Sequence, residues 1–425
     1  MILPTNGKVV VIDDNPEEGL ALVKALSRNN ISVKYFDGIN VDDMPTEPLK
    51  DIRIVFLDMI LGTEGQKLTT QAAKAAAALR KVVDTSKRVP YIMFAWTKDK
   101  RLIRRVLKYL KDKNSEPIMY LDLEKSECKN INGDYDITAI ENQLNEKCVD
   151  FKSLTAFLSW ENLVNDCAGE IYKDFTSFYQ VDEQWDSNLK GIIYGLAEAF
   201  VGKEKNQDTT TTDRERLRNA MFCINSVFID TLENTVQKDD LVEVGKINSA
   251  SIANEVKARI NTKMHLCENS KTALNQTGNL YIHNSRSGQR VIKDIVSRNA
   301  AKKEKIDEIM KSKPKLLELD ITPRCDYAQD KGYVRLLSGI ILPSKFLGGT
   351  YFKTNKFSYQ DCRVMTINKD DHYLLFDYRY FKSLTTAEIK ERSIVPKYRI
   401  RHEMVVDIQA SFSNHVNRFG VTCVD

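Results

Sequence analysis

The sequence has no long apolar run and no recognisable export signal. Its apolar stretches fall well short of the roughly 20 residues that a helix needs to cross a bilayer. The N-terminus lacks a signal-peptide layout, because its first apolar run is followed by acidic residues. We therefore expect a cytoplasmic protein with no membrane contact.

Paired cysteines and a strong net charge are also missing. No CxxC pair occurs, which argues against a zinc site or a disulfide framework and favours a reducing compartment. A net charge of +4 over 425 residues is too small to indicate a partner, whereas 42% hydrophobic residues exclude wholesale disorder. The length predicts two or three domains. The eight cysteines are Cys128, Cys148, Cys167, Cys223, Cys267, Cys325, Cys362 and Cys423.

Carboxylates end two short apolar runs near the N-terminus. The run Lys8–Ile12 leads into Asp13 and Asp14, and the run Ile54–Leu57 leads into Asp58. Such β-branched runs are typical of buried parallel strands, whose C-terminal ends meet at the ligand-binding edge of a sheet. Crowded carboxylates repel unless a cation lies between them, and Mg²⁺ is the natural occupant. Diverging side chains, or a Lys or Arg filling that space, would contradict this interpretation.

Residues 8 to about 128 resemble the receiver domain of two-component response regulators. The resemblance rests on the acidic pair after the first strand and on Asp58 after the third, at a separation that suits a βαβαβ segment. It implies a doubly wound, flavodoxin-like α/β fold with a five-stranded parallel sheet. It further implies that Asp58 is the phosphoacceptor, that Asp14 and Asp58 bind Mg²⁺ directly, that Asp13 acts through water, and that the Ile60 carbonyl is another ligand.

Two further positions match the family pattern only in part. Receivers carry a Ser or Thr at the end of the fourth strand, and Thr97 supplies this hydroxyl if the strand is two residues longer than usual. Otherwise Ala95 takes the position and the hydroxyl is missing, so both assignments stay open. Lys125, after the fifth strand, is the candidate for the ammonium that neutralises the phosphoryl charge.

The chemistry implied by this resemblance is transfer of a phosphoryl group to the protein itself. A histidine kinase or another phosphodonor would be the source, and catalysis would consist of positioning and charge neutralisation. The resulting aspartyl phosphate would shift a two-state surface that contacts a partner protein. The chain would then be a phosphoacceptor and switch and not an enzyme with turnover.

A helical region follows the receiver-like segment. Residues 136–182 carry apolar side chains at three- and four-residue steps, which predicts a buried stripe or, as the alternative, a helix that forms a homodimer. We expect another helix at 186–201 and an exposed loop over the polar residues 202–213. Further helices are expected from Arg214, near 247–263 and near 289–311.

The segment Arg286–Lys315 holds ten Lys or Arg against four Asp or Glu. Such a run can bind phosphates of nucleic acid, but it is more often a solvated face. No aromatic residues interleave the charges, and no helix-turn-helix spacing is present. Nucleic acid is therefore not expected as a partner.

From Leu316 onward the sequence favours strands. The runs Leu316–Ile321, Val334–Leu342 and Tyr373–Tyr380 predict an α+β region with a small barrel-like or strongly bent sheet, closed by a helix over Glu403–Phe419. Turns are expected at Gly348–Gly349 and at Asn368–Asp371.

The most individual motif of this region is Thr322–Lys331. Its Cys325, Asp326, Gln329 and Lys331 resemble a stretch of uncharacterised bacterial proteins, some of them associated with phage defence (Detocs-like). A nucleophilic Cys325 would need a base, for which His372, His402 and His415 are the candidates. A buried Cys with a capping Asp is the plainer interpretation, and His415 and Arg418 are more simply structural.

The sequence thus predicts three domains and two competing functions. The domains are a receiver over 1–135, a helical region over 136–315 and an α+β domain over 316–425. The favoured function is a Mg²⁺-dependent phosphoacceptor that switches or buffers signalling, in anti-phage defence, through protein contacts of its helical and C-terminal regions. The alternative is an effector enzyme with chemistry near Cys325 and Asp326, gated by the receiver.

Overall fold

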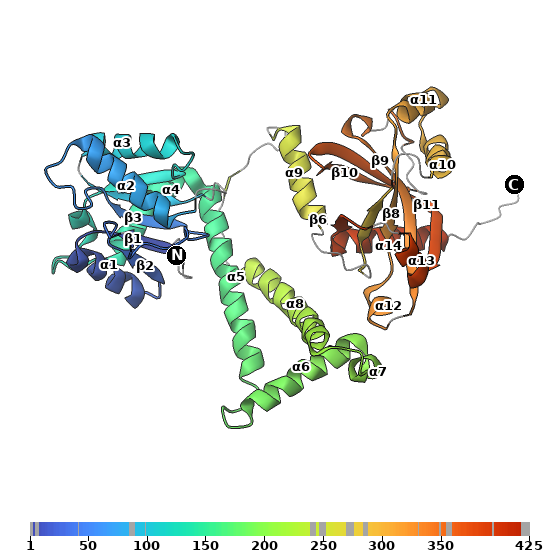
Figure 1. The fold of residues 1–425 in the computed structure, drawn as a ribbon, viewed down its shortest axis with the longest axis horizontal. Coiled ribbons are helices and arrows are strands. Elements are labelled where there is room, and N and C mark those ends of the chain that lie inside the picture. The colour runs from blue at the N-terminus through green and yellow to red at the C-terminus, as the bar shows by residue number, and fades with distance from the viewer. Residues whose placement is uncertain are drawn as a thin grey trace, which may run out of the picture. The chain divides into compact units, whose positions relative to one another are not determined.

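The chain folds into two compact units (Figure 1). One contains Met1–Trp185 and Ile224–Lys246, and the other contains Asp186–Cys223 and Ile247–Asp425. Among the described residues, no helix is both long enough and apolar enough to cross a membrane. The computed structural model describes residues 3–4, 8–40, 42–84, 90–97, 99–238, 244–245, 252–268, 276–283, 288–329, 331–347, 350–353, 359–392 and 395–417.

A five-stranded parallel sheet forms the N-terminal part of the chain, as predicted. Its strand order is β2-β1-β3-β4-β5, and all neighbouring strands run parallel. The central strands are apolar and buried on both faces, the usual state of a parallel sheet between helices. The strands are β1 (Val9–Ile12), β2 (Val33–Phe36), β3 (Ile54–Asp58), β4 (Ile92–Trp96) and β5 (Met119–Leu123).

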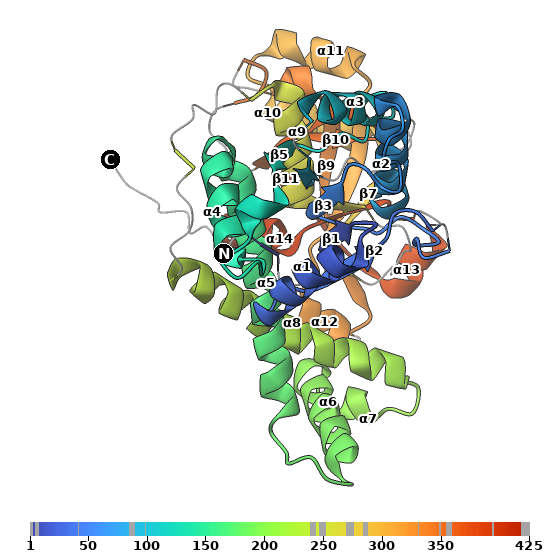
Figure 2. The ribbon, with the colours of Figure 1, turned by 90° about the vertical axis from the view of Figure 1, so that its left-hand side faces the viewer.

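Two helices cover each face of this sheet (Figure 2). Helices α2 and α3 pack on one face, and α1 and α4 pack on the other. The side chains of Asn15 and Asp99 accept backbone N–H bonds at the starts of α1 and α3, which fixes where these helices begin. The helices are α1 (Pro16–Arg28), α2 (Leu68–Val82), α3 (Lys100–Lys111) and α4 (Ile137–Cys148), with a short helix η1 (Lys125–Cys128) after β5.

One connection differs from a complete βαβαβ arrangement. The described residues between β2 and β3 form turns instead of a helix. Pro45 and Pro48 lie in this segment, and proline removes a backbone N–H that a helix needs. Met44 and Ile52 are nevertheless buried against the sheet, so this segment covers the face beside α2.

The expected helices follow the first sheet. Helix α4 leads through η2 into α5, whose Leu158 still packs in the core of the first unit. Helices α6, α7 and α8 come next along the chain. Their bounds are η2 (Val149–Phe151), α5 (Lys152–Thr176), α6 (Trp185–Val201), α7 (Lys203–Gln207) and α8 (Asp213–Lys238).

The prediction of an exposed loop over residues 202–213 is confirmed in part, because most of these residues are exposed although some of them form a helix. The segment contains α7, and Asn206 and Thr211 are buried. Some of their polar groups have internal partners: Arg216 Nε donates to the Asn206 carbonyl at 2.9 Å, and Thr211 Oγ1 donates to the Lys205 carbonyl at 2.9 Å. Asn206 Oδ1, in contrast, is buried with no hydrogen-bond partner among the described residues.

A curled antiparallel sheet of seven strands dominates the second unit. Its order is β10-β11-β9-β8-β7-β12-β6. Two strands near opposite ends of this order lie close together. The Tyr398 hydroxyl on β12 donates to the side chain of Asn368, directly after β10, at 3.1 Å. The strands are β6 (Leu266–Glu268), β7 (Asn279–Ile282), β8 (Lys315–Asp320), β9 (Tyr333–Pro343), β10 (Tyr359–Ile367), β11 (Asp370–Thr385) and β12 (Tyr398–Ile400).

Helices pack on both faces of this curled sheet. Helix α14 contributes Val405 and Ile408 to one core, whereas α10 and α11 contribute to a separate core on the other face. Asn368 and Lys369 have φ of 52° and 74°, so the predicted turn between β10 and β11 is present. The remaining elements are α9 (Asn254–His265), α10 (Gln289–Asn299), α11 (Lys303–Lys311), α12 (Arg324–Ala328), η4 (Ser344–Phe346), α13 (Thr386–Glu391) and α14 (His402–Val416).

Some boundaries differ from the sequence analysis. Strands β6 and β7 lie inside the stretch expected to be helical, and the helix expected near 289–311 is interrupted at 300–302. The predicted turn Gly348–Gly349, Arg418 and the start of the helix expected at 247 lie outside the described residues. The domain boundaries after residues 135 and 315 stay predictions.

Candidate functional site

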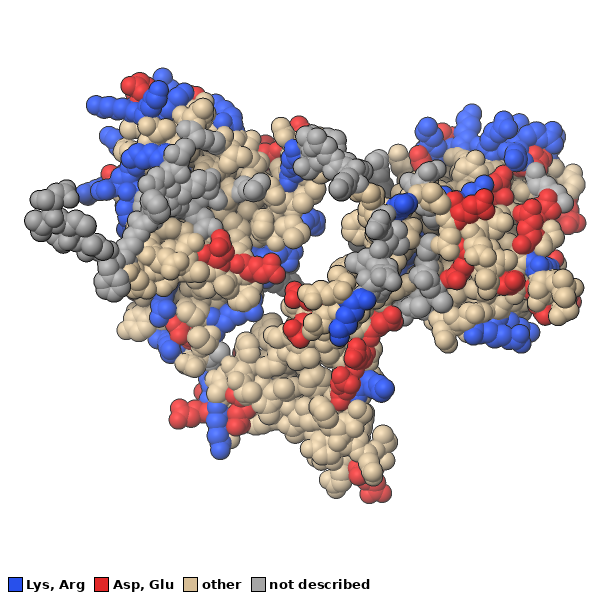
Figure 3. Space-filling model, turned by 180° about the vertical axis from the view of Figure 1, so that it is seen from behind, with Lys and Arg blue, Asp and Glu red and all other residues tan. Residues whose placement is uncertain are grey.

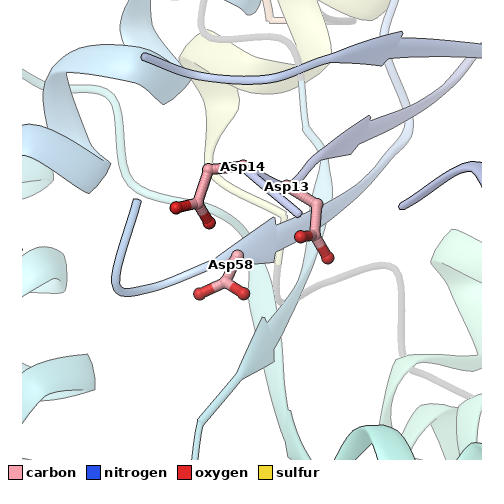
Figure 4. Close-up of side chains that lie close together, drawn as sticks. All are labelled: Asp13, Asp14 and Asp58. Carbon is pink, nitrogen blue, oxygen red and sulfur yellow. The ribbon is translucent and has the colours of Figure 1, made fainter. Parts of the chain in front are cut away.

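Three carboxylates meet at the C-terminal edge of the parallel sheet. Asp13 and Asp14 directly follow β1, and Asp58 is the last residue of β3. One oxygen from each lies within 4.8 Å of the others, and Figure 4 shows the side chains facing a common space. The expected convergence is therefore present, and the group could hold a metal ion.

Lys125 is the main counter-charge of this group. It lies at the start of η1, directly after β5, and its Nζ is 2.7 Å from Asp13 Oδ2 and 3.0 Å from Asp58 Oδ2. The same ammonium is 2.6 Å from Glu18 Oε2 on α1. The predicted position of Lys125 beside the phosphoacceptor candidate is thus what the structure shows, whereas its role stays a prediction.

Lys125 also fills part of the space expected for a metal, the arrangement that we took as evidence against one. It neutralises Asp13 and Asp58 but makes no contact with Asp14, which has no ion pair among the described residues. A divalent ion would therefore have to share or displace the ammonium. Three carboxylates against one nearby lysine still leave surplus negative charge, and oxygen donors suit a hard cation such as Mg²⁺.

The pKa shifts of Asp13, Lys125 and Glu18 reflect the close approach of these charged groups. Burial raises the pKa of Asp13, and the hydrogen bond and charge of Lys125 only partly offset that effect. Burial alone would lower the pKa of Lys125, but the hydrogen bond to Asp13 and the charge of Asp58 outweigh it, so the pKa of Lys125 is raised. The hydrogen bond from Lys125 lowers the pKa of Glu18. The charged form of Lys125 is therefore stabilised by its acidic neighbours, whereas burial disfavours the charged form of Asp13.

The loop after β3 orients the carboxylates through its backbone. Gly62 N–H donates to Asp14 Oδ2 at 2.7 Å, and Ile60 N–H donates to Asp58 Oδ1 at 2.9 Å. Gly62 has a φ of 56°, a left-handed conformation that glycine adopts without strain. The Ile60 carbonyl accepts bonds from the backbone N–H and the hydroxyl of Thr63. To serve as the predicted metal ligand, this carbonyl would have to give up one of those bonds.

The structure leaves both assignments of the hydroxyl position open. Strand β4 ends at Trp96, which pairs with Asp58, so Thr97 lies one residue beyond the strand. Thr97 Oγ1 accepts the Asp99 N–H at 3.1 Å, which helps to form the turn before α3. Ala95 is fully buried.

Sequence reasoning missed Glu18 and the aromatic residues beside the site. The Lys125 ammonium lies 5.7 Å from the centre of the Trp96 ring, and Trp96 packs edge-on against Tyr135 with ring centres 5.4 Å apart. Trp96 is 6% exposed, and its indole N–H has no hydrogen-bond partner among the described residues. Glu18 lies in the first turn of α1, and no motif in the sequence distinguished it from an ordinary acidic residue at a helix start.

The motif around Cys325 shows no catalytic arrangement. Cys325 is exposed, so the prediction of a buried cysteine is wrong, and its Sγ lies 3.8 Å from Asp326 Oδ1. Asp326 is held by Lys331 at 2.9 Å and by Arg335 at 3.0 Å. No histidine is among the described contacts of Cys325.

The three histidines considered as bases have other surroundings. His372 Nδ1 lies 2.9 Å from the Asp370 carbonyl, and the His415 ring packs against Tyr378. Burial, together with the charges of Arg324 and Arg399, lowers the pKa of His402. None of these contacts prepares a base for a thiol.

No family model matches the chain, and no curated protein matches it in sequence. The interpretation of the site therefore rests on its own geometry and on the receiver-like pattern of its residues.

Proposed function

We propose that the N-terminal sheet is a receiver-type phosphoacceptor of a two-component phosphorelay, with Asp58 as the phosphorylated residue. The observation that supports this most is the meeting of Asp13, Asp14 and Asp58 with Lys125 at one edge of the sheet. The strand order 2-1-3-4-5 is that of flavodoxin-like sheets, which bind ligands at this edge.

The proposed reaction is attack of an Asp58 carboxylate oxygen on a phosphorus atom. The new oxygen–phosphorus bond forms as the bond to the leaving group of the donor breaks, and the donor leaves with that electron pair. Mg²⁺ held by Asp13, Asp14 and Asp58 would neutralise charge on the transferred oxygens. Lys125, already beside Asp58 Oδ2, is placed to pair with a phosphoryl oxygen once it forms.

The proposed output is a change in protein contacts. A histidine kinase or another phosphodonor would supply the phosphoryl group, and the helical and C-terminal regions would engage a partner protein. The contacts from Lys125 to Trp96 and from Trp96 to Tyr135 lead from the site to a residue two positions before α4. We place this activity in the cytoplasm, as a switch or phosphate buffer in anti-phage signalling, without substrate turnover.

Incubation of the full chain with Mg²⁺ and acetyl phosphate or phosphoramidate, followed by intact mass measurement, tests the proposal. We expect one added phosphoryl group, sensitive to hydroxylamine as an acyl phosphate is, and absent when EDTA removes the metal. Asp58→Asn should abolish the modification. Asp122→Asn, a carboxylate on β5 that pairs with Lys100 outside the acidic group, should leave it unchanged.

Two results would refute this function. One is wild-type protein that stays unmodified with both donors in the presence of Mg²⁺. The other is modification that persists in Asp58→Asn.

A further inference from the structure

Three segments of the second unit meet beside the motif that follows β8. Gly278, directly before β7, donates its N–H to the Asp320 carbonyl at 2.8 Å and accepts a bond from the Ile400 N–H at 2.8 Å. Thr277 Oγ1 donates to the Thr322 carbonyl at 2.5 Å. These bonds hold the end of β8, the start of β7 and the strand β12 together.

The meeting of these segments brings two arginines and a histidine close to one another. Arg324 is the first residue of α12, Arg399 lies in the middle of β12, and His402 is the first residue of α14. A Cβ atom on Gly278 would lie 3.2 Å from Arg399 Cγ, so the arginine side chain passes over this glycine. Burial and the charge of Arg399 lower the pKa of Arg324, and burial with both arginine charges lowers the pKa of His402. Each group therefore lies within the electrostatic reach of another.

Neither arginine has an acidic partner among the described residues. Their guanidinium groups form no ion pair and donate no hydrogen bond there, whereas Lys331 and Arg335 both pair with Asp326. Arg324 is exposed and Arg399 is partly exposed, so solvent reaches their N–H donors. Like charges that folding brings together repel each other, and a bound anion removes that repulsion.

The start of α14 adds to the positive potential at this place. The N-cap residue Arg401 provides no side-chain cap, and its Nε donates instead to the Lys263 carbonyl at 3.0 Å. The first N–H groups of a helix carry partial positive charge. Glu403, in the first turn of α14, offsets part of this charge. One carboxylate against two guanidinium groups still leaves a positive balance.

We infer that Arg324, Arg399 and His402 form a binding site for a phosphate monoester dianion. A guanidinium group presents its N–H donors as a fork that matches two phosphate oxygens. Two such groups suit the double charge of a monoester better than the single charge of a phosphodiester. His402 can donate a ring N–H to a further oxygen. The site gives Arg324 a use that needs no chemistry at the neighbouring Cys325.

Phosphorus NMR titration of the full chain with inorganic phosphate, in metal-free buffer, tests this inference. We expect saturable binding below about 10 mM. Arg399→Gln and Arg324→Gln should each weaken it at least about tenfold, because a charged, forked contact is lost. Arg335→Gln is the matched control, since that guanidinium already pairs with Asp326, and its affinity should stay within about twofold of wild type.

Two further ligands identify the source of the phosphate group. AMP that binds at least about tenfold more tightly than inorganic phosphate would show that a mononucleotide is recognised. Equal or weaker binding of AMP would show that free phosphate is recognised, and both results support the site. Dimethyl phosphate, a singly charged diester, should bind at least about tenfold more weakly than inorganic phosphate.

The inference does not depend on the proposed phosphoacceptor function, because all three side chains belong to the second unit. Asp58→Asn should therefore bind phosphate as wild type does. A loss of binding in this variant would locate the phosphate in the first unit and overturn the inference.

Circular dichroism shows whether the arginine variants keep their structure. If Arg399→Gln does not, Arg324→Gln, at an exposed position, provides the test. Three other results would overturn the inference. They are absence of saturable phosphate and AMP binding up to about 10 mM, an equal loss of affinity in Arg335→Gln, and dimethyl phosphate that binds as tightly as phosphate.

Discussion

Lys125 supplies the positive charge that the acidic group already contains. Its ammonium contacts two of the three clustered carboxylates and Glu18, and it lies over the Trp96 ring. The same position makes it both a stabilising counter-ion and a competitor for a divalent cation. Asp14, which it does not contact, is the carboxylate open to a second positive charge.

We predict that Lys125→Met strengthens Mg²⁺ binding by at least about tenfold. A unit charge about 5 Å from a divalent metal repels it by roughly 2 to 7 kcal/mol at effective dielectric constants between about 80 and about 20, and methionine keeps most of the side-chain length without the charge. Isothermal titration calorimetry gives the affinity. The matched control is Lys129→Met, because Lys129 contacts Glu18 at 3.7 Å but none of the clustered aspartates. Equal or weaker binding in Lys125→Met would contradict the competition.

The acidic part of the site was predictable because its signal is local. A β-branched run followed by Asp can be recognised within a few residues, and parallel strands bring such ends together. Trp96 and Tyr135 were not predictable in the same way. Their contact joins the end of β4 to a residue two positions before α4, and only the packing of these elements brings the rings together.

At the scale of elements, β8 places two buried carboxylates on one face of the curled sheet. Glu318 pairs with two cations, Arg392 at 3.0 Å and Lys382, and its Oε2 lies 2.9 Å from His283 Nε2. Asp320 has only neutral donors, the Tyr327 hydroxyl and the Thr322 N–H. Burial would raise the pKa of Glu318, but bonds from His283 and Lys382 lower it instead. Burial raises the pKa of Asp320 to about 6.

This raised pKa predicts a pH dependence of stability. The folded state holds a proton on Asp320 more tightly than the unfolded state, so stability from this group is present at low pH and is lost between about pH 4 and pH 6. We expect Asp320→Asn, which cannot ionise, to gain about 3 kcal/mol relative to wild type between pH 4 and pH 7. Urea unfolding at both pH values measures this difference. Asp307→Asn, on the exposed face of α11, should show no such gain.

Elements were predictable where the apolar pattern was long. The runs that became β8, β9 and β11 exceed five residues, whereas β6 and β7 have three and four residues and show no clear period. The resemblance predicted a helix between β2 and β3, but the described residues there form turns. Pro45 and Pro48 disfavour a helix, and Met44 is buried against the sheet. At residues 202–213, polar composition correctly predicted exposure for most positions, but it did not predict α7 or the burial of Asn206 and Thr211.

At the scale of the whole molecule, helix α3 carries positive charge without any acidic residue. Helix α3 contains six Lys or Arg and no acidic residue, so subtracting its charge from the net +4 leaves −2 for the rest of the chain. Only Lys100 and Arg101 of this helix form ion pairs among the described residues. Figure 3 shows Lys and Arg side chains along the upper edge of the first unit, where Figure 1 draws α3.

Six positive charges lie together on α3. We therefore expect their position, more than the net charge of the chain, to determine how strongly the protein is retained on a polyanion such as heparin resin. Changing Arg104, Lys108 and Lys111 of α3 to Glu, or Arg290, Lys293 and Arg298 of α10 to Glu, takes the net charge from +4 to −2 in both variants. We expect the α3 variant to elute at much lower salt than wild type, since unpaired cations on one face release counter-ions together. The α10 variant loses charges that alternate with Asp294, and it should elute close to wild type. Equal shifts in the two variants would show that net charge alone controls binding and that α3 is an ordinary solvated face.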